Sequence, residues 1–281
     1  MNVTGFQILE ELPAEQIWEY RNRVQMRGLK DSQGVDYLGF YVSQSHQIIS
    51  VDRCWIARKE INQALQEIKK EGSAFKRPYK VEIEVLPSGE IKKFWNAKHA
   101  AGGFRQVHDE QNIKLQNWVQ QALTPGRILY DLYGGAGNLS RGLQDRMKEI
   151  HCVDVGSPES SENPALPLGQ KNLDQKNYFF HKKPVLDWIQ ERVQLEKKPE
   201  PKTVILDPPR EGLGENWLPI VESLKKLNVS EIVAVGCDVD NWARDLARLT
   251  RHGWSLKRVA ALDLFPQTPH VESLAFLERD T

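Results

Sequence analysis

The feature that most constrains the fold is a regular alternation of helical and strand-like segments, which begins at about residue 107. Alternation of this kind predicts a mainly parallel sheet with helices on both faces, and such sheets bind ligands at the carboxyl ends of their strands. The expected strands are 127–133, 149–155, 177–181, 203–207, 231–236 and 254–264, and the expected helices are 109–123, 137–147, 184–196, 215–227 and 239–251.

The two ends of the chain depart from this pattern. A final strand, expected at 271–279, follows its predecessor too closely for a helical crossover, so we expect it to run antiparallel to that strand. The first hundred residues instead combine short strand-like segments with one helical pattern at 58–71. The strand-like segments lie at 20–30, 37–43, 46–52, 79–86 and 90–95. The sequence therefore predicts a small α+β domain over 1–100 and an α/β domain over 101–281.

Composition narrows the class of protein. The formal net charge is zero, so any binding of nucleic acid would need a local basic face. No apolar run approaches the ~18 residues of a membrane span, and we expect neither a signal peptide nor contact with a membrane. The three cysteines are far apart and form no CxxC pair, which argues against disulfides and metal sites and favours a reducing cytoplasm.

A glycine-rich turn, 131–137 (DLYGGAG), joins an apolar strand to a helical pattern. Glycines there let the backbone turn tightly and approach a ligand, and the start of a helix adds N–H donors. Asp154 ends the next strand about twenty residues later, where a carboxylate can accept both hydroxyls of a ribose. This spacing is compatible with NAD or with S-adenosylmethionine.

Two later strand ends carry reactive side chains. Asp207 begins an Asp-Pro-Pro-Arg turn whose prolines fix an extended path, which holds Asp207 at the carboxyl edge of the sheet. Cys237 ends the following strand and precedes a helix whose N-terminal field would favour a thiolate. Glu272 opens the last strand. A thiolate that adds to carbon 6 of uracil makes carbon 5 nucleophilic, and a carboxylate can then remove the carbon-5 proton.

Together these motifs resemble those of the RNA uracil-5 methyltransferases, the tRNA and 23S rRNA 5-methyluridine enzymes. The resemblance implies a class I S-adenosylmethionine-dependent methyltransferase fold, with an antiparallel last strand, and an RNA substrate, either tRNA or rRNA. The segments that carry it are 20–25 (YRNRVQ), 39–41 (GFY), 45–49 (SHQII), 104–107 (FRQV), 131–138 (DLYGGAGN), 207–210 (DPPR), Cys237 with 243–245 (ARD), and 263–272 (DLFPQTPHVE).

The resemblance also implies roles for individual residues. Cys237 would be the nucleophile and Glu272 the base that removes the proton. Phe104 would stack on the target nucleotide, and Arg210 and His270 would lie on the substrate side. The contacts to S-adenosylmethionine would come from Gln106, Asp131, Tyr133, Gly134, Gly135, Gly137, Asp154 and Asp207.

The sequence departs from the family pattern at several positions. Cys54 resembles the last ligand of a [4Fe–4S] cluster that many relatives carry, but its three partners are missing, so we expect no cluster. The usual Ser-Cys-Asn-Pro around the nucleophile is here 236–239 (GCDV), and the usual asparagine after Gln-Val is His108. Two alternatives therefore stay open: a class I methyltransferase with another acceptor, and a non-catalytic RNA-binding relative. In the main interpretation we expect a monomeric, cytoplasmic enzyme.

Overall fold

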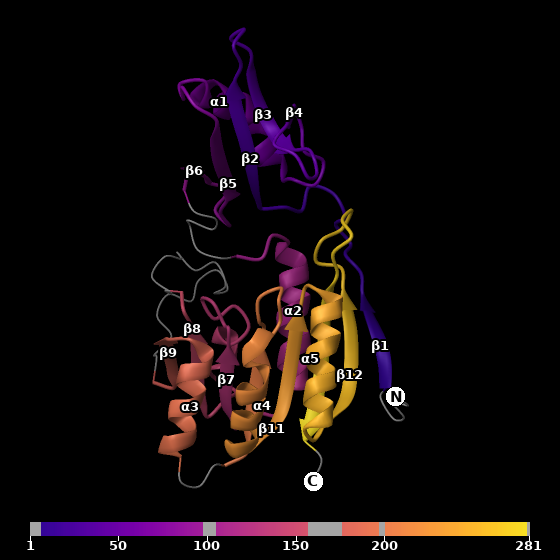
Figure 1. Cartoon of the computed structure of the whole chain (residues 1–281). Helices are drawn as coiled ribbons and strands as arrows, with labels where there is room; N and C mark the ends of the chain where they lie inside the picture. The colour runs from indigo at the N-terminus through magenta and orange to yellow at the C-terminus, as the bar shows by residue number, and fades with distance from the viewer. Residues whose placement is uncertain (1–6, 98–104, 157–175, 197–199, 280–281) are drawn as a thin grey trace. The chain divides into compact units, whose positions relative to one another are not determined.

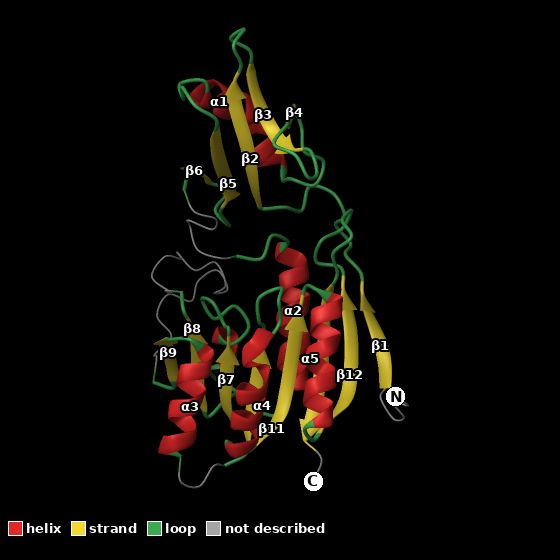
Figure 2. Ribbon diagram, viewed as in Figure 1, coloured by secondary structure: helices red, strands yellow, loops and turns green. Residues whose placement is uncertain are grey.

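The computed structural model describes residues 7–97, 105–156, 176–196 and 200–279. Contacts divide these residues into two compact units. The smaller unit is Glu15–Asp109, and the larger one combines the residues that precede it with those that follow it. Figure 1 and Figure 2 show the elements of both units. The N-terminal limit of the small unit thus lies at Glu15, whereas the sequence placed all of residues 1–100 in it.

Within the described residues, the larger unit contains an eight-stranded sheet in the order β1-β12-β13-β11-β10-β7-β8-β9. Strand β13 runs antiparallel to both of its neighbours, and the other pairs are parallel. This confirms the expected mainly parallel sheet with an antiparallel last strand. The strands are β1 (Gln7–Leu12), β7 (Ile128–Leu132), β8 (Glu149–Asp154), β9 (Tyr178–Lys182), β10 (Lys202–Leu206), β11 (Val229–Gly236), β12 (Trp254–Leu262) and β13 (Glu272–Arg279).

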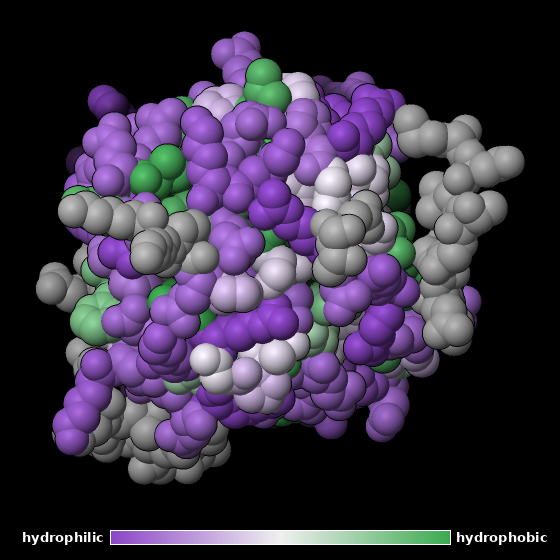
Figure 3. Space-filling model, turned by 90° about the horizontal axis from the view of Figure 1, so that it is seen from below, coloured by the Kyte–Doolittle hydropathy of each residue, from purple (hydrophilic) through white to green (hydrophobic). Residues whose placement is uncertain are grey.

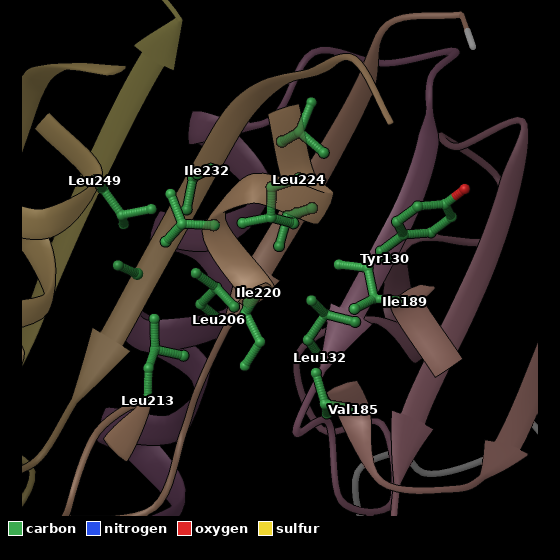
Figure 4. Packing of buried hydrophobic residues seen from close by; sticks show 14 of the residues in the cluster. Tyr130, Leu132, Val185, Ile189, Leu206, Leu213, Ile220, Leu224, Ile232 and Leu249 are labelled. Atoms are coloured by element: carbon green, nitrogen blue, oxygen red, sulfur yellow. The ribbon is translucent and has the colours of Figure 1, made fainter. Parts of the chain in front are cut away.

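Helices cover both faces of this sheet. One face packs against α3 (Val185–Leu195), α4 (Trp217–Lys226) and α5 (Val239–Arg251), and Figure 4 shows the apolar side chains between them. The other face packs against α2 (Asp109–Ala122). Because both faces are covered, successive residues of a central strand enter different cores. In β10, Val204 and Leu206 face the first cluster and Ile205 faces the second, which explains the unbroken apolar run.

The helix expected at 137–147 is absent. Only the short 3-10 helix η1 (Arg141–Leu143) forms there, flanked by turns. Polar side chains in this segment bond to neighbouring elements, and such bonds compete with helix formation. Asn138 bonds Asn112 of α2 (Nδ2 to Oδ1, 2.8 Å), and the Ser140 hydroxyl bonds Asp131.

Strand β1 was not expected, and it pairs in parallel with β12. Its side chains are tied to the sheet by distant residues. Glu10 accepts hydrogen bonds from Arg258 (2.8 Å) and from the Trp118 indole (2.9 Å). The first strand of the chain therefore belongs to the larger unit.

The smaller unit is an antiparallel sheet of five described strands in the order β4-β3-β2-β5-β6, with α1 (Lys59–Gly72) packed on one face. This agrees with the expected α+β composition. Its core includes Met26, Leu38, Ile61 and Ile83, all of which are buried. The strands are β2 (Arg23–Lys30), β3 (Asp36–Tyr41), β4 (Ile48–Ser50), β5 (Tyr79–Val85) and β6 (Ile91–Trp95).

Two properties matter in the part of the chain that the structure describes: whether a helix could cross a membrane and how polar the surface is. No helix there is both long enough and apolar enough to cross a membrane. The face shown in Figure 3 is covered mainly by hydrophilic side chains, with apolar residues scattered among them. The apolar side chains lie largely in the three clusters inside the two units.

Candidate active site

The site lies at one edge of the large sheet, where the parallel strands end. Asp154 is the last residue of β8, Asp207 directly follows β10 and Cys237 directly follows β11. Strand β13 runs the other way, so its first residue, Glu272, reaches the same edge. Figure 2 shows β11 and β12 with their arrowheads at this edge. The fold therefore brings together side chains that are up to about 120 residues apart, as is usual for open α/β sheets.

Cys237 and Glu272 lie on neighbouring strands at matching positions. Gly236 of β11 pairs with Ser273 of β13, so the next residues outward are Cys237 and Glu272. The Glu272 side chain is buried, with a relative exposure of 4%. Burial raises the pKa of its carboxyl group to about 8; the Asp207 charge acts in the same direction and Arg210 against it.

The thiol of Cys237 does not behave as the sequence led us to expect. Burial raises its pKa above the usual value, and the Glu272 charge raises it further, while Arg210 opposes both. The helix that follows begins at a capped N-terminus: the Asp238 carboxylate accepts a hydrogen bond from the Asn241 N–H (3.0 Å). The prediction of a lowered thiol pKa was wrong, because burial and the Glu272 charge outweigh the opposing charge of Arg210.

The glycine-rich turn packs tightly against a buried acid. A Cβ atom on Gly134 would lie 2.5 Å from Asp131 Oδ2 and 2.7 Å from Cys152 Sγ, so only glycine fits there. Tyr133 has a φ of +63°, an uncommon conformation for a side-chain-bearing residue. Asp154 closes the turn, because its Oδ2 accepts a hydrogen bond from the Gly135 N–H (3.0 Å).

Three carboxylates converge beside this turn. Asp131 is fully buried, its Oδ2 accepts a hydrogen bond from Ser140, and its Oδ1 has no hydrogen-bond partner among the described residues. Burial raises the pKa of Asp131 to about 6, and burial with the charges of Asp131 and Asp154 raises that of Asp207 to about 7. The Asp207 charge also raises the pKa of Cys237 and of Glu272, so Asp207 links the other two acids electrostatically to these two residues.

This arrangement fits a cationic ligand. S-adenosylmethionine carries a sulfonium and an ammonium charge, which would offset the repulsion among the three carboxylates. Asp131 Oδ1 has no hydrogen-bond partner among the described residues, and the turn leaves open space beside its backbone at Gly135, where an added Cβ atom would meet nothing within 4 Å. The residues present therefore suit this cofactor.

The other predicted site residues are placed as follows. Arg210 is exposed, and its charge acts on both Cys237 and Glu272. His270 is exposed and its ring meets that of Phe265 edge-on. Gln106 belongs to the smaller unit, where its carbonyl accepts a hydrogen bond from Asn22 (2.9 Å). Phe104 lies outside the described residues, so the roles of Gln106 and Phe104 stay predictions from the sequence.

Sequence reasoning did not assign a role to Asp245. This side chain is buried on α5 and bonds the backbone of the loop after Asp207, with Oδ2 accepting from the Leu213 N–H (2.7 Å). The available signal was the Ala-Arg-Asp segment at 243–245, which the family resemblance includes without a stated function.

Comparison with known proteins agrees with the family resemblance seen in the sequence motifs. Residues 190–280 match the family model described as tRNA (Uracil-5-)-methyltransferase. An uncharacterized RNA methyltransferase of Clostridium acetobutylicum is 24% identical over 99% of this chain and 75% of that protein. The 23S rRNA (uracil(1939)-C(5))-methyltransferase RlmD of Shewanella sediminis is 33% identical over 64% of this chain, but that match spans only 39% of RlmD.

A solved structure has the same fold along nearly the whole chain. The tRNA (uracil-54, C5)-methyltransferase of Pyrococcus abyssi, in complex with S-adenosyl-L-homocysteine, superposes with a TM-score of 0.68 over 96% of this chain and 78% of that one, at 19% sequence identity. The fold and the sequence matches agree with the motifs at the sheet edge. The C-terminal part of the chain thus matches the RNA uracil-5 methyltransferase family, and the chain as a whole is similar in sequence to an RNA methyltransferase.

Proposed function

We propose that this protein transfers a methyl group from S-adenosylmethionine to carbon 5 of a uridine in tRNA or rRNA. The observation that carries the proposal is the matched position of Cys237 and Glu272 at the ends of β11 and β13. A nucleophile and a buried carboxylate on adjacent strands are the two groups that carbon-5 methylation of uracil needs.

In the proposed reaction the sulfur of Cys237 forms a bond to carbon 6, and the electrons of the carbon 5–carbon 6 double bond move into the ring as an enolate. When bound, S-adenosylmethionine would supply the methyl group that carbon 5 takes, and the S–CH3 bond would break to leave S-adenosylhomocysteine. Glu272 then takes the carbon-5 proton, the double bond re-forms, and the carbon–sulfur bond breaks to release the thiolate.

The electrostatics of the pair suit this order of events. Two negative charges close together repel each other, so an ionised Glu272 raises the pKa of Cys237, and a Cys237 thiolate raises the pKa of Glu272 in return. Once the sulfur is bonded to carbon 6 its charge is gone, so Glu272 ionises more readily when it is needed as a base. The Arg210 charge favours the ionised form of both groups.

On the cofactor side, we propose that the carboxylates hold S-adenosylmethionine at the glycine turn. Asp154 would accept the ribose hydroxyls, and Asp207 would face the cationic end. Gly135 and Gly137 have φ values of +54° and +84°, which let the turn follow the ligand. The family resemblance implies that the remaining contacts to S-adenosylmethionine come from Tyr133, Gly134 and Gln106.

On the RNA side, Arg210, His270 and Phe104 would contact the target nucleotide. The small unit adds a candidate stacking surface, because Trp55 is 62% exposed and the Arg53 guanidinium lies 4.1 Å from its ring centroid. Exposed aromatic rings with adjacent arginine are typical of surfaces that stack unpaired bases. We propose that this unit faces RNA.

We also propose that the reaction needs no iron–sulfur cluster. Cys54 is half-buried against the core of the small unit, and its N–H bonds the side chain of Asn62 (2.8 Å). The other two cysteines, Cys152 and Cys237, are both in the larger unit. Cys54 alone cannot supply the four thiolates that such a cluster requires.

The proposal is tested with RNA that contains uridine or 5-fluorouridine. Wild-type protein and S-adenosylmethionine should convert uridine to 5-methyluridine, as nucleoside mass spectrometry would show, and should form a covalent adduct with 5-fluorouridine RNA. Cys237→Ala should do neither. Glu272→Gln should trap a covalent complex on ordinary RNA, because the carbon-5 proton stays in place. Cofactor binding with no methylated nucleoside from total tRNA and rRNA would contradict the proposal and favour the non-catalytic alternative, whereas a different methylated nucleoside would favour another acceptor.

A further inference from the structure

We propose that helix α5 acts as a clamp on the turn that carries Arg210, and that Asp245 is the positioning residue at its centre. The inference rests on the proposed function, since it concerns the same site. It gives a role to the Ala-Arg-Asp segment, which the reaction scheme leaves unused.

Three side chains of α5 hold the backbone of residues 210–213. Asn241 Nδ2 donates to the carbonyl of Arg210 (3.0 Å), and Arg244 Nη2 donates to the carbonyl of Glu211 (2.7 Å). Asp245 Oδ2 accepts a hydrogen bond from the Leu213 N–H (2.7 Å). Carbonyl and N–H groups of the turn are thus held from one side by a single helix.

Asp245 is itself fixed from two directions. Its Oδ1 accepts hydrogen bonds from Arg248 (2.7 Å) and Arg244 (3.3 Å). Its side chain is buried, so an unpaired Asp245 carboxylate there would be costly. The turn is shaped to receive it: Gly212 has a φ of +71°, and a Cβ atom there would lie only 2.2 Å from Asp245 Oδ2.

The same helix begins next to the nucleophile. Asp238, which follows Cys237, caps α5 through the Asn241 N–H. The thiol and the Arg210 turn are therefore attached to one rigid element, Cys237 through the chain and Arg210 through the clamp. Because the Arg210 charge acts on both Cys237 and Glu272, the clamp sets the electrostatics of the catalytic pair.

The test uses two pairs of variants. Asp245→Asn keeps the size of the side chain but removes its charge, and Gly212→Ala forces a methyl group into the Asp245 contact. Gly214→Ala is the matched control for Gly212→Ala, because Gly214 also has a positive φ (+57°) but has open space around the added methyl group. Arg244→Gln removes the contact to Glu211 and one partner of Asp245, and it replaces Asp245→Asn if that variant does not fold.

Two readouts separate this inference from the proposed function. The first is the pH dependence of iodoacetamide alkylation of Cys237, followed by peptide mass spectrometry with Cys54 as the internal standard. It needs neither RNA nor turnover. In Asp245→Asn and Gly212→Ala, a displaced Arg210 should stabilise the Cys237 thiolate less. Because the thiolate is the form that reacts, the alkylation profile should shift to higher pH and the rate at pH 8 should fall by about threefold. The second is the rate of adduct formation with 5-fluorouridine RNA, which should fall by about tenfold or more, because positioning errors of about 1 Å are costly.

The outcomes are distinct. The inference is supported if alkylation and adduct formation are both slower in the two clamp variants, Asp245→Asn and Gly212→Ala. In that case Gly214→Ala should behave like wild type, and all variants should still bind S-adenosylhomocysteine. Wild-type profiles in folded Asp245→Asn and Gly212→Ala would overturn it, and so would equal losses in Gly212→Ala and Gly214→Ala, which would indicate backbone strain alone. If wild type shows no methylation, the proposed function fails, but the alkylation profiles still decide whether the clamp exists.

Discussion

Asp207 should make cofactor binding depend on pH in the neutral range. Its pKa is raised to about 7 by burial and by the charges of Asp131 and Asp154, so the carboxyl group is about half protonated at pH 7. A cationic cofactor requires the ionised form. The affinity for S-adenosylmethionine should therefore rise as the pH increases through 7 and level off above it.

The size of the effect follows from the fraction of Asp207 that is ionised. With a pKa of about 7, that fraction is about one half at pH 7 and about one eleventh at pH 6. The dissociation constant should thus be about fivefold weaker at pH 6, a difference of about 1 kcal/mol. This range also keeps the α-amino group of the cofactor charged, because such groups titrate near 8.

Isothermal titration calorimetry at pH 6.0, 6.5 and 7.0 would measure this change. Titrations at pH 7 in buffers with different ionisation enthalpies should show the release of up to about half a proton per cofactor bound. Asp207→Asn should bind more weakly and lose the pH slope, and S-adenosylhomocysteine, which lacks the sulfonium charge, should show a shallower one. A wild-type affinity that is constant from pH 6 to 7, or a slope that survives in Asp207→Asn, would refute the reasoning.

Four further predictions concern stability and RNA binding. Glu272→Gln should stabilise the fold while abolishing turnover. Because the Glu272 pKa is about 8 in the folded state, the wild type loses stability as the pH rises above about 4.5, by up to about 4 kcal/mol at pH 8. Urea unfolding at pH 5 and pH 8 would show whether the variant removes this pH dependence. His181 should destabilise the protein in acid, because burial and the His151 charge lower its pKa to about 4. Its contribution is complete above pH 6.5 and is lost as the pH falls toward 4; because solvent screens this half-exposed ring, we expect a loss of about 1 kcal/mol. His181→Gln should therefore show a flatter dependence of the melting temperature on pH over that range. Asp238→Ala should cost about 1 kcal/mol of unfolding free energy through loss of the α5 cap, whereas an equal loss in Asp238→Asn would contradict a capping role. Trp55→Ala should weaken binding of unstructured RNA by about tenfold with the melting temperature unchanged, as measured by fluorescence anisotropy; an unchanged affinity would remove the stacking surface from the proposal.

Much of the catalytic unit could be predicted because its strands are defined locally. In β10 and β11, residues such as Val204 and Val233 are buried on either face, so the apolar runs are visible in the sequence alone. The antiparallel direction of β13 followed from the short connection before it. These features suffice to place Asp207, Cys237 and Glu272 at one edge of the sheet from the sequence alone.

Other features depend on distant contacts that no local pattern carries. Strand β1 is held by Arg258, 248 residues away from its partner Glu10. The 137–147 segment has helical periodicity, but bonds from Asn138 and Ser140 to other elements replace the helix. The direction of the Cys237 pKa shift depends on burial of the thiol and on the neighbouring Glu272 charge, which the sequence pattern alone did not indicate.

The residues around Cys237 that depart from the family pattern have a structural explanation. A Cβ atom on Gly236 would lie 2.7 Å from the Trp242 ring, so glycine at this position leaves the space that the Trp242 side chain fills. Asp238 caps α5 as an asparagine would, since both side chains offer an oxygen to the Asn241 N–H. The exchange keeps the support of the nucleophile but adds a negative charge beside it. Arg210 is a charged group that lowers the pKa of Cys237, so the clamp proposed for the Arg210 turn bears directly on the reactivity of the thiol.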